Sequence, residues 1–214
     1  DLNLNRMKKE FLKRGGILVG AGVRGGNERG YDWYLAGSGE KELNTTLDVI
    51  AIANGLVSQG YTQAQKIVLT GTSNGGYVVA NAAIRSPESF GLVIPINGVQ
   101  DQLAFPFMDR WGTGWQDEYL NPTEPVDLKQ IFVRAPLENI SNVPNKPFFF
   151  IVNGEEDTRV NKVHSYKLKA RLDQIWPGQS ILYSVDHAGH WAYSTYLLDD
   201  IGAEANARIW AEVF

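Results

Sequence analysis

A serine flanked by glycines follows a short apolar run in the first half of the chain. Residues 71–75 read GTSNG, which matches the Gly-x-Ser-x-Gly pattern of a nucleophile on a sharp strand-to-helix turn. On such a turn the Ser73 hydroxyl stands clear of the backbone, and the N–H of Asn74 points to where an oxyanion forms. We expect side chains at Gly71 and Gly75 to crowd the turn. A glycine-rich turn holding an ordinary serine has the same pattern, so support is needed elsewhere.

An activated serine needs a general base, and the base needs an acid that orients it. Candidate acids Glu155, Glu156 and Asp157 follow a later apolar run, and candidate bases His187 and His190 follow the next one. In parallel sheets such groups lie just past the carboxyl ends of strands. The chain order of serine, acid and histidine is the order of α/β-hydrolases. Periodicity does not choose among the three acids or between the two histidines.

The elements that must position these side chains alternate along the sequence. Short apolar runs predict strands at 17–23, 66–70, 92–96, 147–152 and 181–185, and amphipathic patterns predict helices at 5–14, 44–59, 74–85, 128–133, 163–175 and 193–213. We expect Asn44 or Thr45 to cap the second helix, with Leu47, Ala51 and Ala53 among its inward residues. The alternation predicts an α/β fold with a mostly parallel sheet and helices on both faces.

Composition narrows the function classes. The chain has 214 residues, which suits one large α/β domain, and a net charge of −4, which favours neither nucleic acid nor an anionic membrane as partner. It has no cysteine, so disulfides, thiolate metal sites and a cysteine nucleophile are excluded. No apolar run approaches the roughly 18 residues of a membrane span. We expect a soluble protein with no metal and no cofactor, and the compartment stays open between cytoplasm and periplasm.

Motifs along most of the chain resemble the catalytic domain of the prolyl oligopeptidase family of serine peptidases. The matching stretches, in family order, are Arg24-Gly25-Gly26-x-Glu28-x-Gly30-x-x-Trp33, Gly60-Tyr61-Thr62, Gly71-x-Ser73-Asn74-Gly75-Gly76, Gly98-Val99-x-Asp101, Trp115-x-x-Glu118-Tyr119, Asp157-x-Arg159-Val160, His164-Ser165 and Ala188-Gly189-His190. Two positions depart from the family, Asn27 where a third glycine is usual and Tyr34 where histidine is frequent. Both fall in a predicted loop away from the candidate nucleophile.

The resemblance implies roles for individual residues. Ser73 would be the nucleophile, Asp157 the orienting acid and His190 the base, and the Asn74 N–H would be one oxyanion donor. The resemblance also implies that Arg159 hydrogen-bonds a substrate carbonyl. In the same pocket, Trp115 would stack on the proline ring at the bond to be cut, although the spacing before Trp115 is one residue longer than usual. Its other lining residues would be Val99, Tyr119 and Val160. His164 begins a predicted helix and is interpreted as structural.

The family's remaining parts have no counterpart in these residues. The second oxyanion donor of the family is a tyrosine before the first predicted strand, and no tyrosine precedes Tyr31. The first strands of an α/β-hydrolase and the family's β-propeller are also missing. We therefore expect residues 1–214 to be a single peptidase S9-type catalytic domain truncated at its N-terminus, which belongs with an upstream segment and propeller. Loss of one oxyanion donor costs about 10²–10³ in rate.

The function predicted from the sequence is that of a serine peptidase that cleaves short peptides after proline through an acyl-enzyme. Its partner would be a peptide substrate, with no nucleic acid and no membrane. Two alternatives remain. The same triad serves an esterase or an acylaminoacyl-peptidase, and a catalytically incomplete fragment would carry the same residues.

Overall fold

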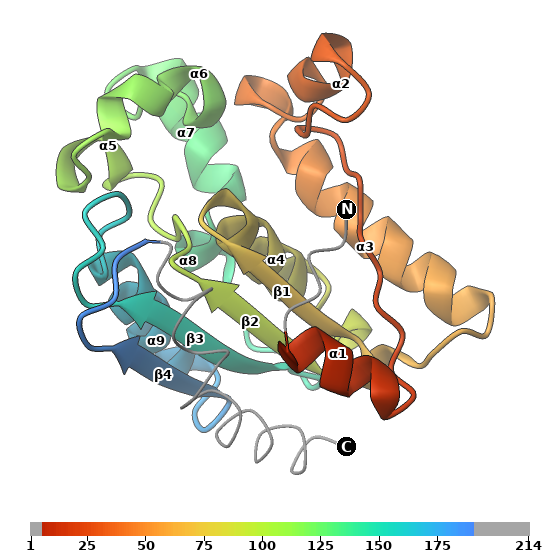
Figure 1. The fold of residues 1–214 in the computed structure, drawn as a ribbon. Helices are drawn as coiled ribbons and strands as arrows, with labels where there is room; N and C mark the ends of the chain where they lie inside the picture. The colour runs from red at the N-terminus through yellow and green to blue at the C-terminus, as the bar shows by residue number, and fades with distance from the viewer. Residues whose placement is uncertain (1–5, 191–214) are drawn as a thin grey trace.

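A parallel sheet of four strands forms the centre of the computed structural model, which describes residues 6–190. The strands lie in the order β1-β2-β3-β4, and every neighbouring pair is parallel (Figure 1). Their bounds are β1 (Val68–Thr72), β2 (Leu92–Ile96), β3 (Phe148–Gly154) and β4 (Ser180–Val185). Because every neighbouring pair is parallel, the carboxyl ends of all four strands meet along one edge of the sheet.

Helices connect the strands and extend beyond that edge. The α-helices are α1 (Arg6–Lys13), α2 (Tyr31–Leu35), α3 (Leu43–Ser58), α4 (Asn74–Arg85), α5 (Phe105–Met108), α6 (Gln116–Tyr119), α7 (Pro125–Arg134), α8 (Pro136–Asn139) and α9 (Val163–Ile175). Short 3-10 helices are η1 (Gly39–Lys41), η2 (Ala64–Lys66), η3 (Pro87–Ser89) and η4 (Gly112–Trp115). In Figure 1, α5, α6 and α7 gather beyond the carboxyl ends of the strands, where they can contribute to a site.

The two faces of the sheet carry separate apolar clusters. On one face, strand residues such as Val93 and Phe149 pack with Val79 of α4, Leu168 of α9 and other apolar residues of α3 and α8. On the other, alternate strand residues such as Ile94 form a second cluster, to which only strand side chains belong among residues 6–190. Burying each large apolar side chain contributes about 1.5–3 kcal/mol, so the first cluster fixes α4 and α9 against the sheet.

Most predicted elements are confirmed. The strand at 92–96 and the helix at 163–175 have the predicted bounds, and the helix after Ser73 ends at Arg85 as expected. The helix predicted at 193–213 lies outside the described residues. The 24–41 segment, predicted as a loop, contains α2 and η1. Its first residue is pinned to α3 because the Arg24 guanidinium donates to both oxygens of Asp48.

The strand predicted at 17–23 is wrong. These residues lie outside every strand of the sheet, and Ile17 and Val19 are 58% and 46% exposed. The prediction rested on an apolar run buried on both faces. A strand exists only through pairing, and the sole bridge nearby joins Arg24 to Gly26. With no neighbouring strand to exchange backbone hydrogen bonds with it, the run belongs to no strand among the described residues.

The interior face of α3 also differs from the prediction. Leu47 is 45% exposed, whereas Thr45 is 7% exposed and Thr46 is fully buried. The hydroxyl of Thr45 donates to the carbonyl of Gly37, and Thr46 accepts from the Asn81 amide, so burial leaves these groups satisfied. The helix begins at Leu43, with neither Asn44 nor Thr45 as its cap. Hydrogen bonds of two threonines, together with the packing of Ala53, therefore orient α3.

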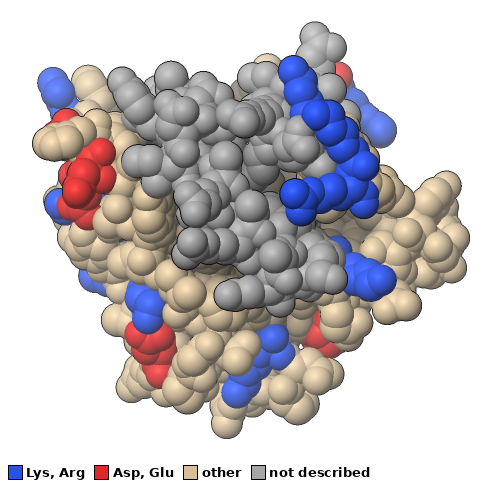
Figure 2. Space-filling model, turned by 60° about the horizontal axis from the view of Figure 1, so that its bottom comes forward, with Lys and Arg blue, Asp and Glu red and all other residues tan. Residues whose placement is uncertain are grey.

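Charged side chains on the surface in Figure 2 are scattered among uncharged ones. Lys and Arg gather most densely toward one edge of that face, while Asp and Glu lie singly or in small groups around it.

None of the helices within residues 6–190 combines the length and apolar character needed to cross a membrane. The same residues hold no group of His, Cys, Asp and Glu arranged to bind a metal ion.

Candidate active site

Ser73 is the single residue between β1 and α4. Its backbone has φ 60° and ψ −121°, a conformation that is rare for a residue other than glycine. The Ser73 N–H donates to the Ile96 carbonyl at the end of β2 over 2.9 Å, which holds the strained turn in place. The serine therefore lies on a strand-to-helix elbow at the carboxyl edge of the sheet.

The glycines around the elbow differ in whether the turn has room for a side chain. A Cβ at Gly71 would lie 2.3 Å from the Gly75 carbonyl oxygen, and one at Gly76 would lie 2.9 Å from the Gly98 Cα, so both positions exclude a side chain. A Cβ at Gly75 would meet nothing within 4 Å, so the expected crowding there is wrong. The physical reason is direction: Gly75 approaches Gly71 with its carbonyl, while its own Cβ position faces open space.

His190 and Asp157 form a buried pair beyond the ends of β4 and β3. The Nδ1 atom of His190 lies 2.7 Å from Oδ2 of Asp157, and the two side chains are 5% and 0% exposed. The other oxygen of Asp157 accepts the N–H groups of Arg159 and Val160, at 2.8 and 3.0 Å. One carboxylate thus orients the imidazole and also shapes the loop that carries Arg159.

The alternative acids and base have other partners. His187 pairs with Glu156 at 3.0 Å on the surface, where their side chains are 91% and 63% exposed. Glu155 accepts from Lys162 and from the Tyr166 hydroxyl. The Lys162 hydrogen bond, followed by that of Tyr166, lowers the pKa of Glu155 to about 2. Burial and hydrogen bonding therefore favour His190 with Asp157 over the exposed pair.

His164 has both ring nitrogens committed. Its Nδ1 accepts the Asp101 N–H at 3.0 Å, so the ring proton resides on Nε2 and is donated to Asp109 Oδ2 at 2.7 Å. The His164 side chain is fully buried. Because neither nitrogen can accept a further proton without losing a bond, His164 is unsuited to act as a base.

Asn97 joins the three loops of the site and was missed by the sequence reasoning. Its Nδ2 donates to the His190 carbonyl at 3.1 Å, and its Oδ1 accepts the Gly154 N–H at 2.9 Å. Its backbone has φ 45°, in the left-handed region that asparagine tolerates. An Asn-Gly pair directly after the buried strand β2 is the signal that could have identified it.

Asn74 is held by Tyr119 across the elbow. The Tyr119 hydroxyl donates to Asn74 Oδ1 at 2.8 Å, and its ring packs edge-on against Phe105. Tyr119, Val99 and Val160 belong to one buried apolar cluster, as members of a common pocket would. All three are 5% exposed or less, and none of them lines the open cavity described next.

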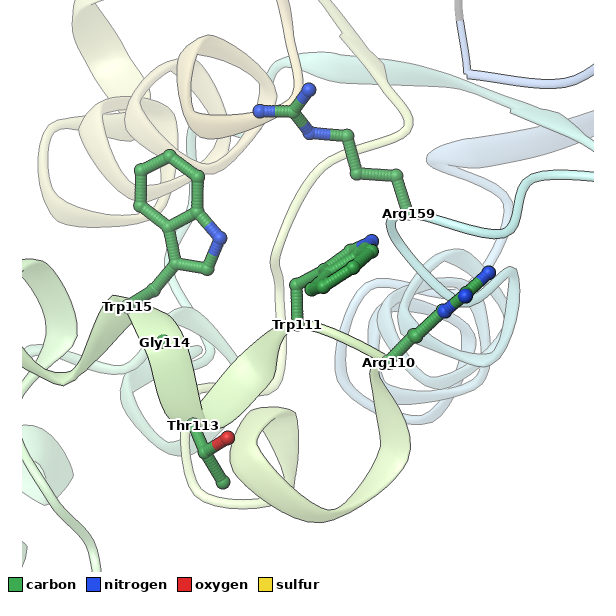
Figure 3. Close-up of a pocket in the computed structure, with 6 residues that line it drawn as sticks. All are labelled: Arg110, Trp111, Thr113, Gly114, Trp115 and Arg159. Carbon is green, nitrogen blue, oxygen red and sulfur yellow. The ribbon is translucent and has the colours of Figure 1, made fainter.

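An open cavity of about 490 Å³ lies beside η4, and Figure 3 shows the residues that line it. Trp115 and Arg159 approach it from different loops, with the Arg159 guanidinium carbon 5.8 Å from the Trp115 ring centre. Arg110 and Trp111 line it too and were missed by the sequence reasoning. Their adjacent positions in an aromatic-rich segment before Trp115 were the available signal.

A buried carboxyl lies beneath the elbow helix. Glu42 is 1% exposed and accepts the Tyr77 hydroxyl at 2.7 Å, while the Arg134 Nε lies 3.6 Å from the same oxygen. Burial raises the pKa of Glu42 to about 7, although Arg134 and Tyr77 oppose the rise. Arg134 also donates to the Tyr119 carbonyl at 2.6 Å, so this group connects to the residue that holds Asn74.

The fold and the elbow define an α/β-hydrolase. A parallel sheet with helices, and a serine on a strand-to-helix turn at its carboxyl edge, are the features of that class. The model of the prolyl oligopeptidase family matches residues 4–201, and the chain belongs to this family.

Curated relatives agree with the family match. The chain is 37% identical to prolyl oligopeptidase A of Galerina marginata over 85% of its length, which is 25% of that protein. It is 35% identical to the dual function macrocyclase-peptidase POPB of the same fungus, and 34% identical to the prolyl endopeptidase of Dictyostelium discoideum. These two matches cover 76% of the chain, and 22% and 21% of the relatives. The chain thus spans about a quarter of the length of the relatives it matches.

Solved structures give the same family. A structure from a study of two prolyl endopeptidases aligns over 99% of this chain and 31% of its own, with a TM-score of 0.90 at 27% identity. Prolyl oligopeptidase B of Galerina marginata, bound to a 35mer hydrolysis and macrocyclization substrate, aligns over 89% of this chain and 27% of its own. Its TM-score is 0.77 at 30% identity.

Proposed function

We propose that this chain is part of the catalytic domain of a serine peptidase that cleaves short peptides after proline. The observation that carries the proposal is the buried pair of His190 and Asp157, joined Nδ1 to Oδ2 at 2.7 Å and tied through Asn97 to the edge where Ser73 lies. Membership of the prolyl oligopeptidase family supports it. The upstream segment and propeller expected from the sequence belong to the same proposal.

The proposed reaction assigns one step to each side chain. His190 takes the proton of the Ser73 hydroxyl as Oγ of Ser73 attacks the carbonyl carbon of the proline residue. The N–H of Asn74 donates to the oxyanion that forms, and His190 returns the proton to the departing amine. Water activated by His190 then releases the acyl group from Ser73. Asp157 keeps the proton on Nδ1 and stabilises the imidazolium.

Proline recognition is assigned to the cavity beside η4. Trp115 offers a flat apolar face to a pyrrolidine ring, and it is 42% exposed, so a ligand can reach it. Arg159, across the cavity, donates to a carbonyl of the substrate backbone through its fork of N–H groups. Val99, Tyr119 and Val160 belong to a buried apolar cluster and do not line the cavity, so their assignment to the proline pocket rests on the family resemblance.

The nucleophile is tested with a fluorophosphonate probe, which reacts with an activated serine. We expect labelling of the full chain to be lost in Ser73→Ala and to persist in Ser58→Ala, a matched change at an exposed serine. Labelling that survives Ser73→Ala refutes the assignment.

The acid and base are tested with matched variants of the two His–carboxylate pairs. Asp157→Asn presents an amide N–H to His190 Nδ1, which forces the proton onto Nε2, and such a change lowers kcat by about 10⁴ in a serine peptidase. Glu156→Gln and His187→Ala alter the exposed pair and should leave labelling unchanged. Equal effects of Asp157→Asn and Glu156→Gln would contradict the proposed roles.

Specificity separates the peptidase from an esterase or acylaminoacyl-peptidase with the same triad. A chromogenic Gly-Pro amide is compared with a simple aryl ester and an acyl-alanine amide. Preferential cleavage of the Gly-Pro amide, reduced in Trp115→Ala, is the expected result. Ester turnover without any preference for proline would favour the alternative.

A further inference from the structure

Two loops form opposite walls of the cavity beside η4. One runs from Asp109 through Arg110 and Trp111 to η4, and the other follows β3 and carries Arg159. In Figure 3 the Arg159 side chain extends from its loop toward the side of the cavity that carries Trp111 and Trp115. The separation of the two walls decides whether one ligand can contact both.

A buried carboxylate joins the bases of these walls. Asp109 Oδ1 accepts the Asn161 N–H at 2.5 Å, and Oδ2 accepts the His164 Nε2–H at 2.7 Å. Asp109 directly precedes Arg110, and Asn161 comes two residues after Arg159. The hydrogen bond between Asp109 and Asn161 therefore joins the two loops next to the residues that line the cavity.

His164 holds the carboxylate in that position. It extends from α9, which packs against the sheet through Leu168 and Leu172. The backbone N–H of Asp101 occupies its Nδ1, which fixes the tautomer that donates to Asp109. Phe105 packs against the ring at 6.0 Å between centres. The carboxylate is thus anchored to a rigid helix, because both its partner and the orientation of that partner are fixed.

We propose that Asp109 and His164 are positioning residues that set the affinity of the cavity for peptide. They hold the Arg159 loop against the wall formed by Trp111 and Trp115. The proposal rests on the proposed peptidase function for the nature of the ligand. A buried carboxylate costs stability unless it is hydrogen-bonded, so the value of Asp109 here lies in fixing the register of two loops.

Asp109→Asn removes one of the two acceptors. The amide offers a single oxygen to two N–H donors, those of Asn161 and His164. Turning the imidazole to the other tautomer sets its Nδ1–H against the Asp101 N–H, so one bond is lost in either arrangement. His164→Gln places an amide near the Nε2 position and keeps a donor to Asp109, whereas His164→Asn keeps only an acceptor for the Asp101 N–H.

The experiment measures affinity in the full chain carrying Ser73→Ala. Acetyl-Ala-Pro-amide is titrated, and binding is followed by tryptophan fluorescence, which Trp111 and Trp115 report from the cavity. We expect Asp109→Asn and His164→Asn each to weaken binding about tenfold, and His164→Gln to recover most of it. Asp173→Asn, which removes the carboxylate of an ion pair with Lys169 on the surface of α9, is the matched control and should bind as the parent does.

A second readout separates positioning from general damage. In chains that retain Ser73, the rate of fluorophosphonate labelling should fall by much less than the affinity, because the small probe does not span the cavity. Hydrogen exchange at the Asn161 N–H should accelerate in Asp109→Asn and in His164→Asn. Affinity that matches the Asp173→Asn control, or parallel loss of affinity, labelling and folded signal in both His164 variants, overturns the proposal.

Failure of this proposal is distinguishable from failure of the proposed function. A parent chain that is not labelled at Ser73 refutes the peptidase mechanism. The affinity comparison remains interpretable in that case, because it is made in chains that carry Ser73→Ala. Peptide binding that is insensitive to Asp109→Asn in a chain that is labelled normally refutes the positioning role alone.

Discussion

Glu42 lies under the elbow helix, and its replacement by glutamine makes the stability of the fold less sensitive to pH. Burial is the main cause of its raised pKa of about 7, against an ordinary value of 4.5. A carboxyl with a raised pKa in the folded state binds more protons folded than unfolded between these two values. Stability from this group is therefore fully present below about pH 4.5 and is lost as the pH rises to about 7.

The size of the effect follows from the two pKa values. At roughly 1.4 kcal/mol per pH unit, ionisation of Glu42 costs the folded state about 3 kcal/mol by pH 8. Glutamine keeps an oxygen that accepts the Tyr77 hydroxyl and carries no charge at any pH. Arg134 lacks the Glu42 carboxylate as a partner both in Glu42→Gln and in the acid form of the parent. The stability difference between the two proteins is therefore compared at pH 5 and pH 8, and its change reports the ionisation of Glu42.

Urea unfolding of the full chain at pH 5, 6, 7 and 8 measures this difference. We expect Glu42→Gln to gain about 2–3 kcal/mol relative to the parent between pH 5 and pH 8, with an unchanged dependence on urea. Glu118, whose pKa burial also raises, is present in both proteins, and its charge contributes to the raised pKa of Glu42. Glu138→Gln changes an exposed carboxyl and serves as control. Parallel stability curves for parent and Glu42→Gln over this range would refute the reasoning.

Three further predictions concern the elbow and its supports. Gly71→Ala should destabilise the chain by about 1–3 kcal/mol in urea unfolding, because its Cβ would lie 2.3 Å from the Gly75 carbonyl oxygen, whereas Gly75→Ala should cost less than about 1 kcal/mol; equal costs would contradict the geometry. Asn97→Gly keeps the left-handed backbone but removes two hydrogen bonds, so we expect a loss of about 1–3 kcal/mol together with slower fluorophosphonate labelling. Unaltered labelling would mean that the His190 loop keeps its position without this side chain. Tyr119→Phe removes the hydroxyl that donates to Asn74, and labelling should slow about two- to tenfold; a rate equal to that of the parent would exclude a role for the hydroxyl in positioning the elbow.

Local patterns predicted the elements whose signals are contained within the segment. β2 is a continuous apolar run and is buried along its full length, and α9 repeats its apolar residues at helical spacing. The strand–glycine–serine–helix order likewise needs only neighbouring residues to be read. These elements therefore have the bounds that the sequence indicates.

Features that depend on distant partners were not predictable in the same way. The run at 17–23 looks like a strand, but pairing decides whether a strand forms, and pairing is a property of other segments. In α3, Thr45 faces inward and donates to the carbonyls of Arg24 and Gly37, while Thr46 accepts from the Asn81 amide of α4. The bond between Asp109 and Asn161 joins residues 52 positions apart and has no local signature.

Position in the sequence leaves two candidate bases, and the hydrogen bonds favour the one that the family resemblance implies. A buried His–Asp pair is not by itself a catalytic signature, because residues 6–190 contain two of them, His164 with Asp109 and His190 with Asp157. In the first pair the acid contacts Nε2, and a backbone N–H occupies Nδ1, so the imidazole is locked into a structural role. In the second pair the acid contacts Nδ1, the nitrogen that a serine hydrolase assigns to its orienting carboxylate. A candidate base is therefore distinguished from a histidine that joins loops by two features. These are the ring nitrogen that contacts the acid and the group that contacts the other ring nitrogen.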